Sequence, residues 1–207
     1  MNKEFKKRLL SSIILIPVSF FLIIKGSIFF IFFLSILFLA TSYEWVKMSK
    51  KNILLKFFGI VFLFFSFYTA FEIRGDENFE DFLFIITICI FTDIGGFIFG
   101  KTFKGKKLSY ISPNKTYAGV YGSFLLSFLI MFLLKNYIDL KFIIILLFTF
   151  SVCLLSQFGD LFFSLLKRMA KVKDTGKLLP GHGGILDRID GLVISVPFNI
   201  LVYHLAI

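Results

Sequence analysis

Residues able to do phosphate chemistry are concentrated in one stretch of the chain, residues 164–191. It holds six Lys or Arg residues, three Asp residues, one His and a Gly-Gly pair. Cations beside clustered carboxylates are the groups that hold a polyphosphate together with a divalent metal ion. The stretch therefore predicts a phosphate-binding site, and its charged residues are Lys167, Arg168, Lys171, Lys173, Asp174, Lys177, Asp187, Arg188 and Asp190.

A polar stripe leads into this stretch along a predicted helix. Asp160 is followed at i+4, i+7 and i+8 by three polar residues, Ser164, Lys167 and Arg168. This spacing places all four on one helical face. A carboxylate at the edge of an apolar segment is costly and usually faces a cavity or a partner. We therefore predict that Asp160 and Ser164 belong to the site, whereas Lys167 and Arg168 could equally anchor the end of the helix.

A glycine-rich turn follows at residues 181–184, with His182 as its second residue. Glycine has no side chain to block an approaching ligand, so the backbone N–H groups of Gly183 and Gly184 could bind an anion. His182 could contact phosphate. It is a weak candidate for a metal ligand, because His204, the other His in the chain, lies far away in the last apolar segment.

Paired carboxylates come directly after the turn. Asp187 and Asp190 share a face if a helix starts near Gly184. Together with Asp160 they offer the oxygen ligands that Mg²⁺ prefers, since it is usually bound by one or two carboxylates plus substrate phosphates. We predict Asp160, Asp187 and Asp190 as metal ligands. The alternative is an acidic pair favoured only by the dipole at a helix start.

A second polar region precedes the stripe. Asp93 is an acid inside an apolar segment, where ionisable residues are usually functional. Gly95-Gly96 after it allows close helix approach. The run 95–102 also fits the GxxxxGK[ST] phosphate-loop pattern, but it ends a predicted membrane helix and does not join a strand to a helix. The hydroxyl and amino groups that could donate to phosphate here are Ser112, Lys115 and Thr116.

The elements that must position these residues are membrane helices. The chain is 57% hydrophobic, and its apolar residues form long uncharged blocks. We predict an all-α, polytopic membrane bundle of about seven spans, with one membrane domain over 1–207. The predicted spans are Leu9–Ile24, Ile28–Tyr43, Ile53–Ile73, Phe82–Gly100, Gly119–Leu134, Phe142–Leu161 and Leu192–Ala206.

The placement of charge predicts the orientation. With the N-terminus in the cytoplasm, 19 of the 23 Lys and Arg residues fall on the cytoplasmic side. The net charge of +10 thus follows membrane topology, and we expect no nucleic-acid partner. The N-terminal spans occupy 1–92. The predicted catalytic region, 93–197, carries two cytoplasmic loops at 101–118 and 168–190, and 192–206 forms the last span.

These motifs resemble the signature of phosphatidate cytidylyltransferases, also called CDP-diacylglycerol synthases. The similarity covers about half the chain, from Asp93 to Pro197. The residues that carry it are Ser112-Pro113-x-Lys115-Thr116-x-x-Gly119, Gly159-Asp160-Leu161, Ser164-x-x-Lys167-Arg168-x4-Lys173-Asp174 and Pro180-Gly181-His182-Gly183-Gly184-x-x-Asp187-Arg188-x-Asp190. Two positions depart from the family pattern, since an acidic or amide residue is usual at Ala118 and a Glu at Phe163.

The resemblance implies transfer of a cytidylyl group from CTP to phosphatidate in the cytoplasmic leaflet, yielding CDP-diacylglycerol and pyrophosphate. It implies Mg²⁺, with the number of ions left open, a homodimer, and a multi-pass protein of the plasma membrane. The residues implied as catalytic are Asp160, Lys167, Arg168, Asp187 and Asp190. Those implied in substrate binding are Asp93, Ser112, Lys115, Thr116, Ser164, Lys173, Asp174, His182, Gly183, Gly184 and Arg188.

Other functions remain open at this point. Related CTP-using membrane enzymes include CDP-archaeol synthases and polyprenol or phytol kinases, and the helices that choose the lipid cannot be read from the sequence. A transporter of phosphorylated solutes would place charges near the bilayer midplane and show repeated halves, neither of which is evident. An inactive relative is the remaining alternative, motivated by Ala118 and Phe163.

Overall fold

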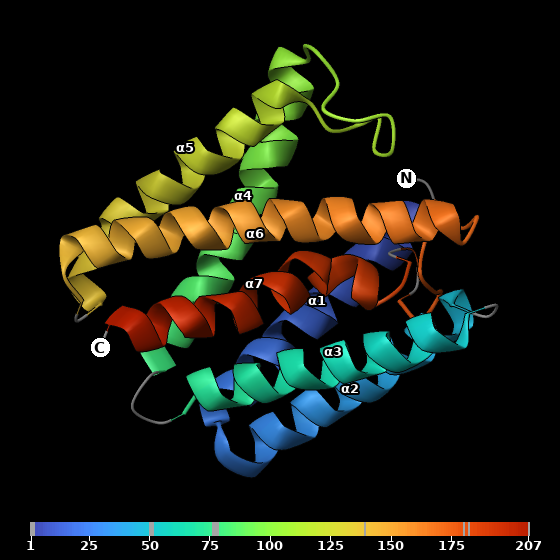
Figure 1. The fold of residues 1–207 in the computed structure, drawn as a ribbon, viewed down its shortest axis with the longest axis horizontal. Helices are drawn as coiled ribbons and strands as arrows, with labels where there is room; N and C mark the ends of the chain where they lie inside the picture. The colour runs from blue at the N-terminus through green and yellow to red at the C-terminus, as the bar shows by residue number, and fades with distance from the viewer. Residues whose placement is uncertain are drawn as a thin grey trace. The chain divides into compact units, whose positions relative to one another are not determined.

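The structure is a computed structural model that describes residues 3–49, 52–75, 79–138, 140–179, 181 and 183–206, with side chains described only between 11 and 199. These residues form seven α-helices and a 3-10 turn (Figure 1). The elements are α1 (Lys3–Lys25), α2 (Ser27–Met48), α3 (Ile53–Ile73), α4 (Phe79–Phe103), α5 (Tyr117–Leu134), η2 (Lys135–Tyr137), α6 (Phe142–Met169) and α7 (Leu186–Ala206).

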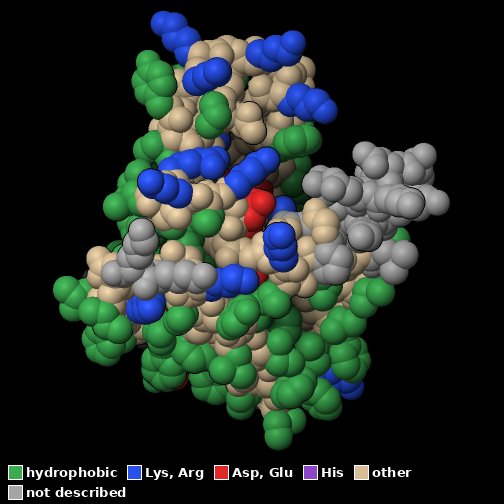
Figure 2. Space-filling view, turned by 90° about the vertical axis from the view of Figure 1, so that its right-hand side faces the viewer, with side chains coloured by type: hydrophobic (Ala, Val, Ile, Leu, Met, Phe, Trp, Pro, Cys, Tyr) green, Lys and Arg blue, Asp and Glu red, His purple; other side chains and the backbone are tan. Residues whose placement is uncertain are grey.

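Each predicted span corresponds to one helix, so the all-α fold is confirmed. Five helices within the described residues, α2 to α6, are long and apolar enough to cross a membrane. The apolar part of α1, Ser11–Lys25, is shorter. Hydrophobic side chains make up large parts of the surface (Figure 2), as expected for helices that face lipid. The chain is therefore an integral membrane protein.

The chain divides into two compact units. Unit 1 comprises residues 1–71 and 167–189, and unit 2 comprises residues 72–166 and 190–207. Helices α6 and α7 each contribute to both units, because the division falls within them.

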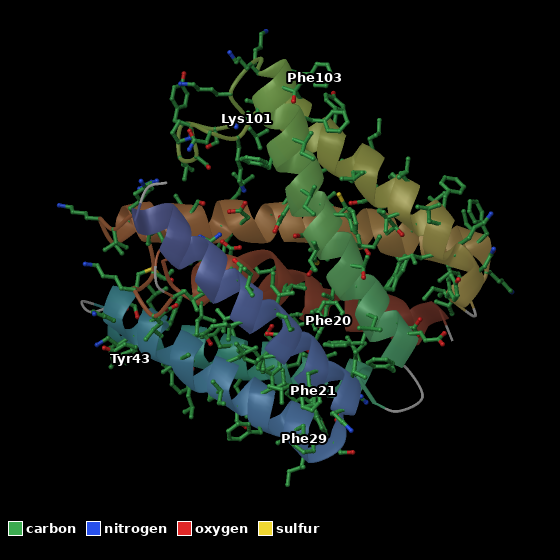
Figure 3. All side chains as sticks on the ribbon, turned by 180° about the vertical axis from the view of Figure 1, so that it is seen from behind. Phe20, Phe21, Phe29, Tyr43, Lys101 and Phe103 are labelled. Carbon is green, nitrogen blue, oxygen red and sulfur yellow. The ribbon has the colours of Figure 1, made fainter. Side chains whose placement is uncertain are left out.

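Unit 1 is built on aromatic packing between its N-terminal helices. Helices α1 and α2 join in a tight hairpin at Gly26, whose φ of 64° favours glycine. Phe21 and Phe29 meet edge to face across this hairpin, with ring centroids 6.5 Å apart (Figure 3). Phe38 of α2 packs edge to face on Phe64 of α3 at 6.0 Å. These contacts join α1, α2 and α3, and the segment 167–189 belongs to the same unit.

Unit 2 contains a close pair of helices, α4 and α5. A Cβ added at Gly95 would lie 2.5 Å from the Gly122 carbonyl oxygen, so only glycine fits there. The Ser123 hydroxyl donates to the Thr92 carbonyl at 2.7 Å, and the Thr92 and Ser127 hydroxyls lie 2.8 Å apart. Small residues and hydroxyl bonds are the usual means of helix association in lipid. The close approach predicted from Gly95-Gly96 is confirmed.

Residues 142–166 of α6 and 190–206 of α7 complete unit 2. Phe84 of α4 stacks on Phe148 of α6 with centroids 6.2 Å apart, and Phe124 of α5 stacks on Phe150 at 5.4 Å. A Cβ at Gly159 of α6 would lie 2.8 Å from the Asp190 carbonyl oxygen of α7. Gly159 thus lets α7 pass close to α6, one residue before Asp160.

Gly95→Ala should destabilise unit 2. The new methyl group would meet a backbone carbonyl that cannot move aside as a flexible side chain could, and such overpacking costs about 1–3 kcal/mol. Gly100→Ala on the same helix is the matched control, because its Cβ would come no closer than 3.2 Å to the Thr116 hydroxyl. Thermal unfolding in detergent measures both. Equal unfolding midpoints for the two variants would contradict the close contact.

Candidate active site

Asp187 is a buried carboxylate of the signature stretch that accepts several hydrogen bonds. Its side chain is 7% exposed, and its Oδ1 accepts a hydrogen bond from Lys167 Nζ at 2.7 Å. Its Oδ2 accepts from the Thr175 backbone N–H at 2.8 Å, the Thr175 hydroxyl at 3.0 Å and the Gly184 N–H at 3.0 Å. Asp187 therefore fastens the end of α6 and two points of the α6–α7 loop, residues 170–185, to the start of α7.

The local chain conformation explains why glycine is needed here. Gly181 and Gly183 have φ values of 79° and 90°, which glycine adopts without strain. The Leu179 N–H donates to the Gly183 carbonyl at 3.0 Å and closes the turn. The turn presents the Gly184 N–H to an anion, as its glycines suggested, but in this structure the anion is the protein's own Asp187.

The environment of Asp187 favours its charged form. Burial alone would raise its pKa, but the hydrogen bond and charge of Lys167 and the backbone N–H groups of Thr175 and Gly184 outweigh that effect. The pKa of Asp187 therefore lies below its ordinary value. Lys167, whose side chain is 11% exposed, is held as a partly buried cation beside it.

Glu44 belongs to the same cluster, although sequence reasoning did not single it out. It lies in α2 and is fully buried. Its carboxylate accepts hydrogen bonds from the Thr175 hydroxyl and from the N–H groups of Ile185 and Leu186. The available signal was an acid inside an apolar helix, the same argument that selected Asp93.

Unit 2 holds a second Lys–Asp pair. Lys115 Nζ forms a salt bridge with Asp160 Oδ2, and the Asp160 side chain is 36% exposed. The α4–α5 loop places Lys115 through a Lys115 N–H bond to the Ser112 carbonyl at 3.0 Å. Thr116 caps α5 by accepting from the Gly119 N–H at 3.1 Å. The sequence-predicted residues of this loop, Ser112, Lys115 and Thr116, are thus partly buried and help to hold the loop in place.

The remaining predicted residues fall in both units. Asp190 is buried in α7 and accepts from the Gly191 N–H at 2.9 Å, while Arg168 donates to the Val172 carbonyl at 3.5 Å. His182 and Pro180 lie outside the described residues. Unit 1 contains Lys167, Arg168, Lys173, Asp174, Gly183, Gly184, Asp187 and Arg188, and unit 2 contains Asp93, Ser112, Lys115, Thr116, Asp160, Ser164 and Asp190.

The carboxylates differ in how well they suit a metal ion. Carboxylate oxygens are the right donors for Mg²⁺. Asp160 is partly exposed, and its salt bridge with Lys115 uses Oδ2. Its carboxylate is therefore open to a cation. Three of the four donors to Asp187 converge on Oδ2 and the fourth, Lys167, bonds Oδ1, so Asp187 is less open to a cation than Asp160 is. Within the described residues, no three Asp, Glu, His or Cys side chains are gathered around one point.

Comparison with known proteins places these features in context. The sequence model of the cytidylyltransferase family matches residues 51–206. The phosphatidate cytidylyltransferase of Rickettsia felis is 31% identical over 201 residues, which cover 92% of this chain and 88% of the relative. Those of Staphylococcus epidermidis and Bacillus subtilis are 42% and 37% identical, over 69% and 67% of this chain. The chain spans about half the length of these last two relatives, 54% and 53%.

In the variant Asp187→Asn, the free energy of unfolding should depend less on pH in the acid range than it does in the unmodified protein. Because the pKa of Asp187 is lowered in the folded protein, its stabilising contribution is complete above its ordinary pKa of about 4 and is lost as pH falls through the lowered value. We expect the variant to unfold at a lower temperature at pH 7 and to lose less on acidification. Fluorescence of Trp45, the single Trp and a residue of unit 1, reports the unfolding. Parallel pH curves for the two proteins would exclude this contribution.

Phe163→Glu should also destabilise the protein, although Glu is usual there in the family that the sequence resembles. Phe163 is 2% exposed and packs edge to face on Phe162 at 5.9 Å. Replacing it removes a buried ring and buries a carboxylate, at a cost of about 3 kcal/mol or more. Phe162→Glu, at a neighbouring position 39% exposed, is the control. The prediction fails if the two variants have equal unfolding midpoints.

Proposed function

The chain belongs to the cytidylyltransferase family, and we propose that it transfers a cytidylyl group from CTP to phosphatidate, giving CDP-diacylglycerol and pyrophosphate. The observation that carries the proposal is the Lys167–Asp187 pair with its ring of loop donors. The pair places a cation and several N–H groups at the end of a membrane helix. A lipid phosphate there could accept some of the hydrogen bonds that Asp187 accepts in this structure.

The proposed reaction needs positioned cations more than a base. A phosphate oxygen of phosphatidate attacks the α-phosphorus of CTP, a new P–O bond forms, and the bond to the β-phosphate oxygen breaks to release pyrophosphate. The attacking oxygen is already ionised, so no proton has to be removed. The protein must reduce repulsion between two anions and hold them in line. The cations proposed for this are Lys115, Lys167, Arg168, Lys173 and Arg188.

We propose Mg²⁺ as the cofactor, with Asp160 and Asp190, both in unit 2, among the carboxylates that would hold it. When bound, the ion would neutralise charge on the transferring phosphates. Lys115 keeps Asp160 oriented through its salt bridge, and Lys167 does so for Asp187. The partial exposure of Asp160 supports its role as the ligand most open to an incoming ion.

The membrane setting supports a lipid substrate. Diacylglycerol tails can enter sideways between lipid-facing helices while CTP arrives from water. We propose that the N-terminus and both polar loops face the cytoplasm, that the protein resides in the plasma membrane, and that it acts as a homodimer. The excess of Lys and Arg on the proposed inner side supports this orientation.

An assay on detergent-purified protein tests the function. Labelled CTP and phosphatidate with Mg²⁺ should yield a lipid-soluble labelled nucleotide and pyrophosphate together, and EDTA should abolish both. Release of CDP with an unlabelled lipid phosphate would instead establish a CTP-dependent lipid kinase. Absence of turnover on any lipid would favour an inactive relative.

Site variants refine the assay. Asp187→Asn and Asp160→Asn should each reduce kcat by about 100-fold or more, since each removes a charge that organises phosphate contacts. Lys141→Ala, at an exposed lysine preceding α6, should retain full activity. Near-normal turnover of Asp187→Asn at matched expression would remove that residue from the proposed machinery.

A further inference from the structure

Glu44 is a buried acid with an unusual set of partners. It is 0% exposed and lies within α2, a helix long and apolar enough to span the membrane. The hydrogen bonds that its carboxylate accepts come from residues 131 to 142 positions later in the chain. The family match starts at residue 51, so it does not include Glu44.

Both oxygens of the Glu44 carboxylate accept hydrogen bonds at the start of α7. Oε1 accepts from the Ile185 N–H at 3.1 Å, and Oε2 accepts from the Leu186 N–H at 2.9 Å. Helix α7 begins at Leu186, so these N–H groups have no partner within the helix. A negative charge is also favoured at a helix N-terminus. Glu44 therefore acts as a helix cap supplied by a distant helix.

The loop is shaped to admit this carboxylate. A Cβ at Gly176 would lie 2.3 Å from Glu44 Oε1, and a Cβ at Gly184 would lie 2.5 Å from Oε2. Both glycines thus leave room for Glu44, which accounts for two small residues in the loop without reference to a ligand. A larger side chain at either position would push the loop away from α2.

Thr175 connects Glu44 to the candidate site. Its hydroxyl lies 3.1 Å from Glu44 Oε2 and 3.0 Å from Asp187 Oδ2, so the two carboxylates share one hydroxyl. Asp187 also follows Leu186 directly in α7. Any shift of Glu44 would therefore move both the first turn of α7 and the oxygen of Asp187 that Thr175 holds.

We propose that Glu44 is a positioning residue for the reaction proposed above, on which this role depends. It fixes the α6–α7 loop and the first turn of α7 from α2, and so sets the direction of Asp187 and of the Lys167 paired with it. Glu44 makes no contact with substrate in this role. Its effect passes through Thr175 and through the N–H groups of Ile185 and Leu186.

Kinetics of Glu44→Gln separate positioning from bulk stability. Gln keeps the size of Glu but loses one acceptor oxygen and the charge, so at least one of the loop donors is left unpaired. We expect kcat to fall by about tenfold or more with a much smaller change in the KM for CTP, because a misdirected Asp187 affects the transition state most. Thr41→Val is the matched control. Thr41 is equally buried on α2 and donates to the carbonyls of Leu37 and Phe38 in its own helix.

Amide exchange gives a readout that does not require activity. In Glu44→Gln, the amides of Ile185 and Leu186 should exchange with deuterium about tenfold faster or more, while the amides of α3 exchange as in the unmodified protein. In the control variant Thr41→Val, all amides should exchange as in the unmodified protein. Thr175→Val removes the loop hydroxyl that connects Glu44 to Asp187. The double variant Glu44→Gln with Thr175→Val should lose less activity than the product of the two single losses.

The outcomes distinguish this inference from the proposed function. If the unmodified protein forms no CDP-diacylglycerol, the proposed function fails, and amide exchange alone decides whether Glu44 holds the loop. Unchanged exchange at residues 185–186 in Glu44→Gln overturns the inference. Faster exchange with an unchanged kcat overturns its catalytic relevance. If Glu44→Gln does not fold, Thr175→Val decides, and wild-type exchange and kcat in that variant overturn the inference.

Discussion

The start of α7 depends on two buried carboxylates that share their donors with one loop. Glu44 and Asp187 are both nearly free of solvent contact, and an unpaired charge in such surroundings would be prohibitive. Each accepts hydrogen bonds from N–H and hydroxyl groups of the loop, and these bonds hold the loop to α2 and to the start of α7. The carboxylates and the loop therefore stabilise one another, and this mutual requirement gives a glycine-rich segment a fixed conformation.

In unit 2 the helices associate without the hydrophobic effect, which does not favour contacts between apolar helices in lipid. Its α4–α5 contact uses glycines at backbone distance and hydroxyls that bond across the interface. The same close packing recurs where α7 passes Gly159 of α6. Rigid support at this point matters for function, because the next residue is Asp160, whose salt bridge to Lys115 joins α6 to the α4–α5 loop.

The proposed chemistry suits these supports. Transfer of a cytidylyl group between two phosphates requires cations and carboxylates held in fixed directions, and it needs no residue to remove a proton. Each Lys–Asp pair involves α6, with Asp160 bound to Lys115 of the α4–α5 loop and Lys167 bound to Asp187 at the start of α7. The proposed positioning role of Glu44 adds a residue of α2 to these supports. Helix α2 lies outside residues 51–206, which the family's sequence model matches.

The sequence by itself determined the membrane helices and the stretch that carries the family signature, because hydropathy and residue spacing are local properties. It also indicated the close approach at Gly95. Only the tertiary structure revealed Glu44, since its partners lie more than a hundred residues away and no local pattern joins them. Likewise, the burial of Phe163 and the donors that occupy Asp187 depend on which helices and loops meet, and hydrophobic periodicity does not specify those contacts. The direction of the N-terminus stays a prediction, because it follows from charge placement and not from packing.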